Sequence, residues 1–290
     1  TVAGGIPVIN TLEHLIKINK VVKIEAILNG TTNYILSDIR ENHHSFEHSL
    51  QIAQQKGYAE ADPSNDIDGW DAFYKLMVVS DLVFGNQPTW SEVNHRGIGQ
   101  ITIDHITAAD SIGCRIKHVA SLEYSGGVVI ASVEPILVST THSLYSVEGV
   151  ENAILISGDI VGELKLQGPG AGALPTASAI VEDLSTIYRL NPTGENQKKF
   201  DSIKFSNLHM DSTTDWLLIG NQVPATDVFA IQDNWEITGN QGHSVQCCVI
   251  SGFDIEVRKW LKQQKQLTGY RIGDVNQIKI GHSFDCKPYL

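Results

Sequence analysis

A dense group of carboxylates and one lysine stands in the first third of this chain. Its members, in order, are Glu60, Asp62, Asp66, Asp68, Asp71 and Lys75. Carboxylates can hold the ammonium group of an amino acid. A crowded or desolvated lysine can exchange a proton near neutral pH. The group could therefore bind an amino acid and transfer a proton.

The residues around Pro63 predict a loop followed by a new helix. Proline favours an extended conformation at Asp62 and prevents a helix from running through that point. Asp66 or Asp68 can cap the helix that follows, with Gly69 in its first turn. We therefore interpret these three aspartates as caps and loop carboxylates rather than as catalytic groups.

The helix expected over residues 68–84 places Asp71 and Lys75 four residues apart, on one face. Glu60 lies on the loop before this helix and can reach the same face, so we predict that the three side chains converge. Taken by themselves, Asp71 and Lys75 could also be an ordinary exposed ion pair worth a few tenths of a kcal/mol.

The composition excludes several classes of function. The chain has 290 residues, 42% of them hydrophobic, and is long enough for one large or two ordinary domains. Its net charge of −12 argues against a nucleic-acid or anionic-membrane partner. No run of about 20 apolar residues predicts a membrane span.

The ends of the chain and its cysteines predict a cytoplasmic protein. The first residues have neither the basic nor the apolar region of a signal peptide. Without an initiator Met, they also lead us to expect a portion of a longer protein. The cysteines are Cys114, Cys247, Cys248 and Cys286, which form no CxxC pair and are expected to be reduced thiols. We expect Cys247 and Cys248 to be core residues.

The remaining sequence alternates helical and strand-like spacing. Helices are expected over residues 8–20, 33–40 (capped by a threonine), 45–56 (capped by Ser45), 106–112, 175–188 and 255–264. Strands are expected over residues 21–28, 117–123, 128–133, 154–157, 164–166, 216–219 and 245–250. Residues 168–173 form a glycine-rich loop before a helix, which can bind an anion or simply pack closely on a strand.

Three of these motifs, in this order and spacing, resemble the catalytic half of the homoserine dehydrogenase family. They are the stretch Asn29-Gly30-Thr31-Thr32-Asn33-Tyr34-Ile35-Leu36, the block from Glu60 to Lys75, and Gly168-Pro169-Gly170-Ala171-Gly172 with Pro175-Thr176-Ala177-Ser178-Ala179. The opening Val2-Ala3-Gly4-Gly5-Ile6-Pro7 fits the same family. The resemblance covers residues 1 to about 190. It implies reduction of aspartate semialdehyde to homoserine with NADPH or NADH, in threonine and methionine biosynthesis.

The resemblance also implies roles for individual residues. Lys75 matches the proton donor to the aldehyde oxygen, and Glu60 and Asp71 match the residues that hold the amino group of homoserine. Substrate contacts are also implied for Gly57, Tyr58 and Thr31, although an Asn29-Gly30 pair is equally typical of a plain turn.

Cofactor and metal contacts are implied in the same way. Gly170 and Gly172 match positions against the dinucleotide, NADP or NAD. The main-chain carbonyls of Val2, Gly4 and Ile6 match a sodium site. His44 and His48 do not meet the HExxH order, so we interpret them as a solvated helix face rather than a metal site.

The family places a Rossmann half with a GxGxxG loop before the point where this sequence begins, and no GxGxxG occurs in the chain. We therefore expect a truncated enzyme with an incomplete nucleotide site, inactive by itself. The alternative is a non-catalytic amino-acid-binding or dimerising module that keeps the fold.

The fold implied is α+β, a mixed sheet covered by helices on one face. The expected division is a catalytic and dimerisation domain over 1–150, the end of the nucleotide-binding domain over 151–195, and a divergent ACT-like tail over 196–290. A homodimer is implied as well.

Overall fold

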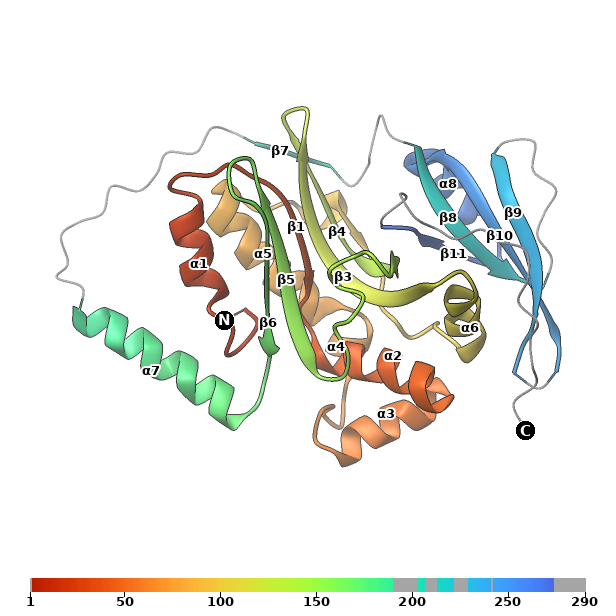
Figure 1. Cartoon of the computed structure of the whole chain (residues 1–290), viewed down its shortest axis with the longest axis horizontal. Helices are drawn as coiled ribbons and strands as arrows, with labels where there is room; N and C mark the ends of the chain where they lie inside the picture. The colour runs from red at the N-terminus through yellow and green to blue at the C-terminus, as the bar shows by residue number, and fades with distance from the viewer. Residues whose placement is uncertain (1, 190–202, 207–212, 222–228, 241, 274–290) are drawn as a thin grey trace.

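A seven-stranded mixed sheet forms the centre of the chain in this computed structural model (Figure 1). The structure describes residues 2–189, 203–206, 213–221, 229–240 and 242–273. Six strands lie in the order β2-β4-β3-β1-β5-β6, and β7 pairs with β4. Their bounds are β1 Val21–Ile27, β2 Val93–His95, β3 Cys114–Ser125, β4 Val128–Ser139, β5 Glu151–Gly158, β6 Gly162–Pro169 and β7 Lys204–Ser206. Because β2 and β7 run parallel to β4 while the other pairs are antiparallel, the sheet is mixed as predicted.

Helices cover one face of this sheet. Leu12 of α1 and Phe73 and Leu76 of α5 pack in one apolar cluster with Ile24 of β1 and Leu122 of β3. An irregular segment over residues 140–150 covers part of the other face through Leu144 and Val147. The helices of this half are α1 Val8–Leu15, α2 Gly30–Asn42, α3 Phe46–Gln55, α4 Ser64–Ile67, α5 Trp70–Phe84, η1 Trp90–Glu92 (a short 3-10 helix) and α6 Ile103–Ser111.

The tail forms a second, four-stranded antiparallel sheet in the order β11-β8-β10-β9. Its elements are β8 Thr213–Gly220, β9 Ala230–Thr238, β10 Ser244–Phe253, α8 Asp254–Leu261 and β11 Leu267–Arg271. The order fourth, first, third, second is that of a split βαβ module. Since α8 is the one tail helix within the described residues, the ACT-like assignment stays a prediction.

The tail packs directly on the central sheet. Leu217 and Val249 of the tail share an apolar cluster with Ile116 of β3 and Leu137 of β4, and Leu137 forms a parallel bridge with Ile272. Cys247 lies in the same cluster. Together with Cys248 it is buried, as predicted.

The beginnings of two helices differ from the predictions. The threonine cap expected for the second helix is wrong, because Asn29 caps α2 and its side chain accepts a hydrogen bond from the backbone N–H of Thr32. Neither Asp66 nor Asp68 caps α5. That helix begins after Gly69, whose φ of 85° has a low energetic cost only for glycine. No side chain caps the N-terminus of α5. Ser45 caps α3 as predicted.

Residues 151–169 continue the same sheet as residues 21–27. The register pairs Glu25 with Leu155, and Leu155 with Lys165. The predicted division after residue 150 therefore falls inside one sheet, since backbone hydrogen bonds cross it along the whole of β5. A division after Pro169, where β6 ends, agrees with the pairing.

Helix α7, Ala173–Arg189, follows the glycine-rich loop and lies beside the N-terminal end of the chain in Figure 1. Its apolar side chains are exposed, and they include Leu174, Ile180, Val181, Leu184 and Ile187. No helix among the described residues has the length and apolar character needed to cross a membrane.

Candidate active site

The site is built where β1 ends and α2 begins. Asn29 leaves the strand in an extended conformation, and its side-chain oxygen caps α2. Its amide nitrogen donates to Asp66 Oδ1 at 2.7 Å and to Asp71 Oδ2 at 2.9 Å. This single buried amide therefore ties together the end of β1, the beginning of α2 and the acidic segment before α5.

Lys75 and Asp71 share one face of α5, as predicted. Lys75 Nζ donates to Asp71 Oδ2 at 2.7 Å and to the main-chain oxygen of Leu28 at 2.8 Å. The neighbours Ala72 and Leu76 are buried in the core and fix the rotation of α5 about its axis. In this orientation Lys75 reaches the end of β1. The side chains are 22% and 32% exposed, so the pair remains accessible to a ligand.

A cavity of about 230 Å³ opens beside this pair. Its lining residues are Glu60, Asp62, Asn65, Asp66, Asp71 and Tyr74. Glu60 and Asp71 thus face one cavity, and Lys75 lies 2.7 Å from Asp71. Among the described residues, no donor forms a hydrogen bond with Asp71 Oδ1 or with the Glu60 carboxylate, so both can accept one from a ligand.

The loop that carries Glu60 is tied to α2 and α3. Gly57 has a φ of 74° and ends α3, and the backbone N–H of Tyr58 donates to the oxygen of Ala53 at 2.8 Å. Thr31 Oγ1 donates to the oxygen of Tyr58 at 2.6 Å. The hydroxyl proton of Thr31 is therefore committed to holding the loop, and only its oxygen lone pairs remain for a substrate.

The glycine-rich loop lies close to the same site. Asn152 Nδ2 donates to the oxygen of Leu28, the atom that also accepts from Lys75. A Cβ added to Gly170 would stand 2.1 Å from that Asn152 nitrogen, so only glycine fits there. Gly172, with a φ of 114°, has only the Pro175 ring near the position of a Cβ. The loop can thus approach a ligand with its backbone.

The N-terminal turn packs on this loop. A Cβ at Gly4 would stand 2.2 Å from the oxygen of Gly170, and the N–H of Gly5 donates to the oxygen of Pro169. The oxygen of Ile6 already accepts from the N–H of Val8 at 2.7 Å, which leaves it one lone pair for a cation. The described residues contain no group of three or more His, Cys, Asp and Glu that could hold a metal ion. The sodium site at Val2, Gly4 and Ile6 stays a prediction.

A second lysine–carboxylate cluster lies on the other side of α2. Glu148 Oε1 lies 3.0 Å from Lys117 Nζ, 2.6 Å from Arg115 and 3.3 Å from Arg40, and Ser37 donates to Glu148 Oε2. Burial lowers the pKa of Lys117 to about 8, although the charge of Glu148 opposes this change. Burial would raise the pKa of Glu148, but the charge of Lys117 lowers it overall.

Sequence reasoning missed three groups that hold Lys75 and Asp71. They are the side chain of Asn29, the side chain of Asn152 and the main-chain oxygen of Leu28. Asp66 was interpreted as a cap, whereas it accepts from Asn29 and lines the cavity. Of these groups, only Asn29 lies in a motif that the sequence analysis had singled out, the turn Asn29-Gly30.

The chain was compared with protein families and curated proteins. The family model described as homoserine dehydrogenase matches residues 7–185. The homoserine dehydrogenase of Neisseria gonorrhoeae is 42% identical over 189 residues, which are 65% of this chain and 43% of that protein. The one of Synechocystis is 39% identical over 206 residues, 70% of this chain and 48% of that protein. The chain therefore spans about half the length of the curated relatives it matches.

Solved structures give the same result. The crystal structure of a homoserine dehydrogenase from Thiobacillus denitrificans superposes with a TM-score of 0.83 at 27% identity, covering 94% of this chain and 69% of that one. A hyperthermophilic archaeal homoserine dehydrogenase in complex with NADPH has a TM-score of 0.55 at 31% identity, covering 66% of this chain and 55% of that one. The first of these matches includes most of the tail.

Proposed function

This chain belongs to the homoserine dehydrogenase family, and on that premise we propose that it supplies the substrate half of an enzyme that interconverts L-homoserine and L-aspartate 4-semialdehyde. The observation that supports the proposal is that Glu60 and Asp71 line one cavity while Lys75 forms an ion pair with Asp71. A dinucleotide-binding half with a GxGxxG loop, a motif that does not occur in these 290 residues, completes the enzyme.

Two carboxylates suit the ammonium group of the substrate. Asp71 and Glu60 line the cavity from two different elements, so a small cation between them gains two charge-assisted hydrogen bonds. Gln54 Nε2 donates to the oxygen of Glu60 at 3.1 Å and holds this part of the loop. Gly57, Tyr58 and Thr31 shape the loop around the substrate.

Lys75 suits the role of the acid. The main-chain oxygen of Leu28 and the carboxylate of Asp71 each accept a hydrogen bond from its ammonium group and thereby fix its direction. The third N–H of the ammonium group remains for the substrate oxygen. NADPH or NADH, when bound, supplies the hydride to the aldehyde carbon. Lys75 then donates its proton to the oxygen of that carbon, and in the oxidation of homoserine it accepts the proton back.

The cofactor is proposed to contact Gly170 and Gly172. Gly170 leaves no side chain between the loop backbone and Asn152. The loop leads directly into the N-terminus of α7, the arrangement in which loops commonly bind anions. The exposed apolar row on α7 supports its assignment to the dinucleotide-binding half, which would cover it. We accordingly assign residues 1–169 to the catalytic domain, 170–195 to the nucleotide-binding domain and 196–290 to an ACT-like tail.

A homodimer in the cytoplasm completes the proposal. The resemblance of the catalytic half to its family supports the dimer. The three thiols that the structure describes are free and buried, which agrees with a reducing compartment.

The decisive experiment gives this chain the dinucleotide-binding half of the Neisseria gonorrhoeae relative and follows NADPH formation from homoserine. Lys75→Ala should lower turnover by about 10²-fold or more, the usual contribution of a positioned acid. Lys17→Ala, which removes an exposed lysine from the end of α1, is the control and should change nothing. A chimera that folds and binds both ligands but never turns over would favour the non-catalytic module.

Calorimetry on the 290-residue chain alone tests the division of labour. Homoserine should bind weakly, because the groups for its ammonium are present, and NADPH should not bind tightly. A micromolar NADPH affinity, about 8 kcal/mol, would overturn the proposed incomplete nucleotide site.

A further inference from the structure

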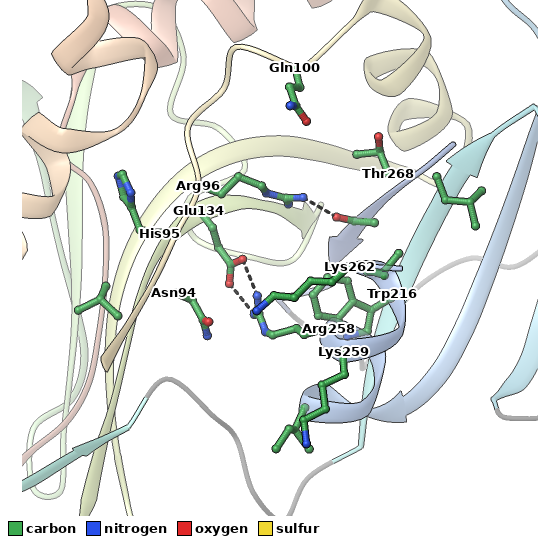
Figure 2. A pocket seen from close by; sticks show the side chains of 15 residues that line it. Asn94, His95, Arg96, Gln100, Glu134, Trp216, Arg258, Lys259, Lys262 and Thr268 are labelled. Atoms are coloured by element: carbon green, nitrogen blue, oxygen red, sulfur yellow. Dashed lines mark hydrogen bonds and ion pairs between the residues drawn. The ribbon is translucent and has the colours of Figure 1, made fainter. Parts of the chain in front are cut away.

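A second, larger cavity lies between the central sheet and the tail (Figure 2). Its volume is about 710 Å³, within the range of small-molecule sites. One wall comes from β2, β4 and the residues that follow β2, and the other from β8, α8 and β11. It shares no lining residue with the cavity beside Lys75.

The charge of this cavity is opposite to that of the chain. The whole chain carries a net charge of −12. The lining, by contrast, has a single carboxylate, Glu134, and four cationic side chains, which are Arg96, Arg258, Lys259 and Lys262. An acidic protein has thus concentrated positive charge at one interdomain cavity.

The single carboxylate is already neutralised. Glu134 accepts two hydrogen bonds from Arg258, at 2.9 and 2.6 Å, and Arg258 also donates to Asp254 at 2.7 Å. Although burial would raise it, the pKa of Glu134 is lowered to about 2 by the charge of Arg258. The Arg258 guanidinium lies over the ring of Trp216. Arg258 thus holds the carboxylate by direct hydrogen bonds, and the more distant charge of Arg96 adds to the lowering of its pKa.

The remaining three cations have no carboxylate partner. Arg96 donates to the main-chain oxygens of Gly269 and Pro135, at 2.9 and 3.1 Å, and both acceptors are neutral. Its Nε is buried without a hydrogen-bond partner. Within the part of the chain that the structure describes, neither Arg96 nor Lys259 nor Lys262 forms an ion pair.

The C-terminal end of a helix attracts lysines by itself, because its dipole favours positive charge. This accounts for Lys259 and Lys262 on α8, which are exposed. It does not account for Arg96, which follows β2 in the other half of the molecule and faces the same cavity in Figure 2. Cations from two separate elements therefore line one cavity, although Lys259 points away from Arg96 in Figure 2.

Arg96 is held in place before any ligand arrives. Its N–H donates to the oxygen of Val133 at 2.9 Å, and its oxygen lies 3.1 Å from His118 Nε2. Two residues later, the N–H of Ile98 donates to the oxygen of Ile67 at 2.8 Å. These bonds fix the backbone, and the oxygens of Gly269 and Pro135 hold the guanidinium, so the side chain loses little freedom on binding, which favours affinity.

We propose that this cavity binds a small molecule that carries two or more negative charges on phosphate or carboxylate groups. Arg96 contacts the anion from the side of the central sheet, and Lys262 contacts it from the end of α8. Lys259 adds positive charge to the same cavity. The carbon skeleton of the ligand lies against Leu261 and Leu267, which also line the cavity.

The test is calorimetry on the full 290-residue chain at low ionic strength, with inorganic pyrophosphate in one arm and citrate in the other. At least one anion should bind with a dissociation constant below about 1 mM. Binding of one anion alone assigns the site to phosphates or to carboxylates.

The variant that carries both Lys259→Gln and Lys262→Gln should weaken this binding by about 10-fold or more, since each charge-assisted contact contributes at least a factor of this order. Both lysines are exposed, so the fold is retained. The matched control, Lys17→Gln with Lys20→Gln, removes the same charge from two exposed positions in the turn between α1 and β1 and should change the affinity less than about 2-fold. The proposal is overturned if neither anion binds, or if the control weakens binding as much as the α8 variant.

Discussion

Two clusters on either side of α2 pair a lysine with a carboxylate, and they differ in what surrounds the pair. At Glu148 three cations and the Ser37 hydroxyl occupy the carboxylate, and Lys117 is 1% exposed. At Asp71 one oxygen accepts two hydrogen bonds, and the residue lines a cavity. The comparison teaches that a local concentration of charge does not by itself distinguish the two clusters, whereas hydrogen-bonding capacity left free beside a cavity does, and this difference supports the proposed site at Asp71.

The largest difference between the clusters should be in stability. Glu148→Ala leaves Lys117 buried beside Arg115 without a carboxylate, so the free energy of unfolding should fall by about 3–5 kcal/mol. Asp71→Ala leaves a lysine that water can reach and should lower the free energy of unfolding by less than about 1 kcal/mol. Urea unfolding of both variants measures the contrast, and equal losses would break it.

The next effect should be on substrate affinity. In the chimera with a dinucleotide-binding half, Asp71→Asn should raise the KM for homoserine by about 10-fold or more, because a charge-assisted hydrogen bond contributes about 1.5–3 kcal/mol. Asp81→Asn is the matched control, an exposed aspartate on the same helix. If both variants had the same KM as the parent, Asp71 would not contact the substrate.

The stability contributed by the cluster of Lys117 and Glu148 should also depend on pH in the alkaline range. The folded pKa of Lys117 is about 8, against a usual value of 10.5, so between these pH values the unfolded chain binds more protons than the folded one. Stability should therefore rise with pH across this window, by about 1 kcal/mol between pH 8 and 9. Lys117→Met should abolish this rise in urea unfolding at the two pH values. A rise of the same size in the variant would assign it to another group.

The smallest effect should come from Thr31. Thr31→Val removes the hydrogen bond to the oxygen of Tyr58, and the free energy of unfolding should fall by about 1 kcal/mol or less. The KM for homoserine in the chimera should change by less than about 3-fold, because the hydroxyl proton already serves the loop. A much larger increase in KM with unchanged stability would instead show direct contact with the substrate.

Local patterns predicted much of the fold. The long apolar strands β3 and β4 around Gly126-Gly127, the Ser45 cap of α3 and the face shared by Asp71 and Lys75 follow from periodicity and capping, which act within a few residues. The strands β2, β7, β9 and β11 were missed. Of these, β9 is largely exposed, so its sequence lacks the apolar run that marks a buried strand.

The partners of Lys75 could not be predicted in the same way. A main-chain oxygen such as that of Leu28 has no signature in the sequence, because every residue has one. Asn152 reaches that atom from a position 124 residues later, and only the pairing of β5 with β1 brings it there. The assignment of the α2 cap failed for a related reason, since the point where β1 ends decides which residue of Asn29-Gly30-Thr31 stands at the helix end.

The central position of β1 has a consequence for the order of folding. Glu25 pairs with Ser121 on one side and Leu155 on the other, so the strand that ends at the proposed site is completed only by segments made much later. Contacts between residues so distant in the chain form slowly, because the intervening loop must close first. During synthesis, Lys75 and Asp71 therefore leave the ribosome long before the Asn152 side chain that helps to hold the oxygen of Leu28. The cluster of Asp71 and Lys75 should be one of the last parts of this half to become ordered.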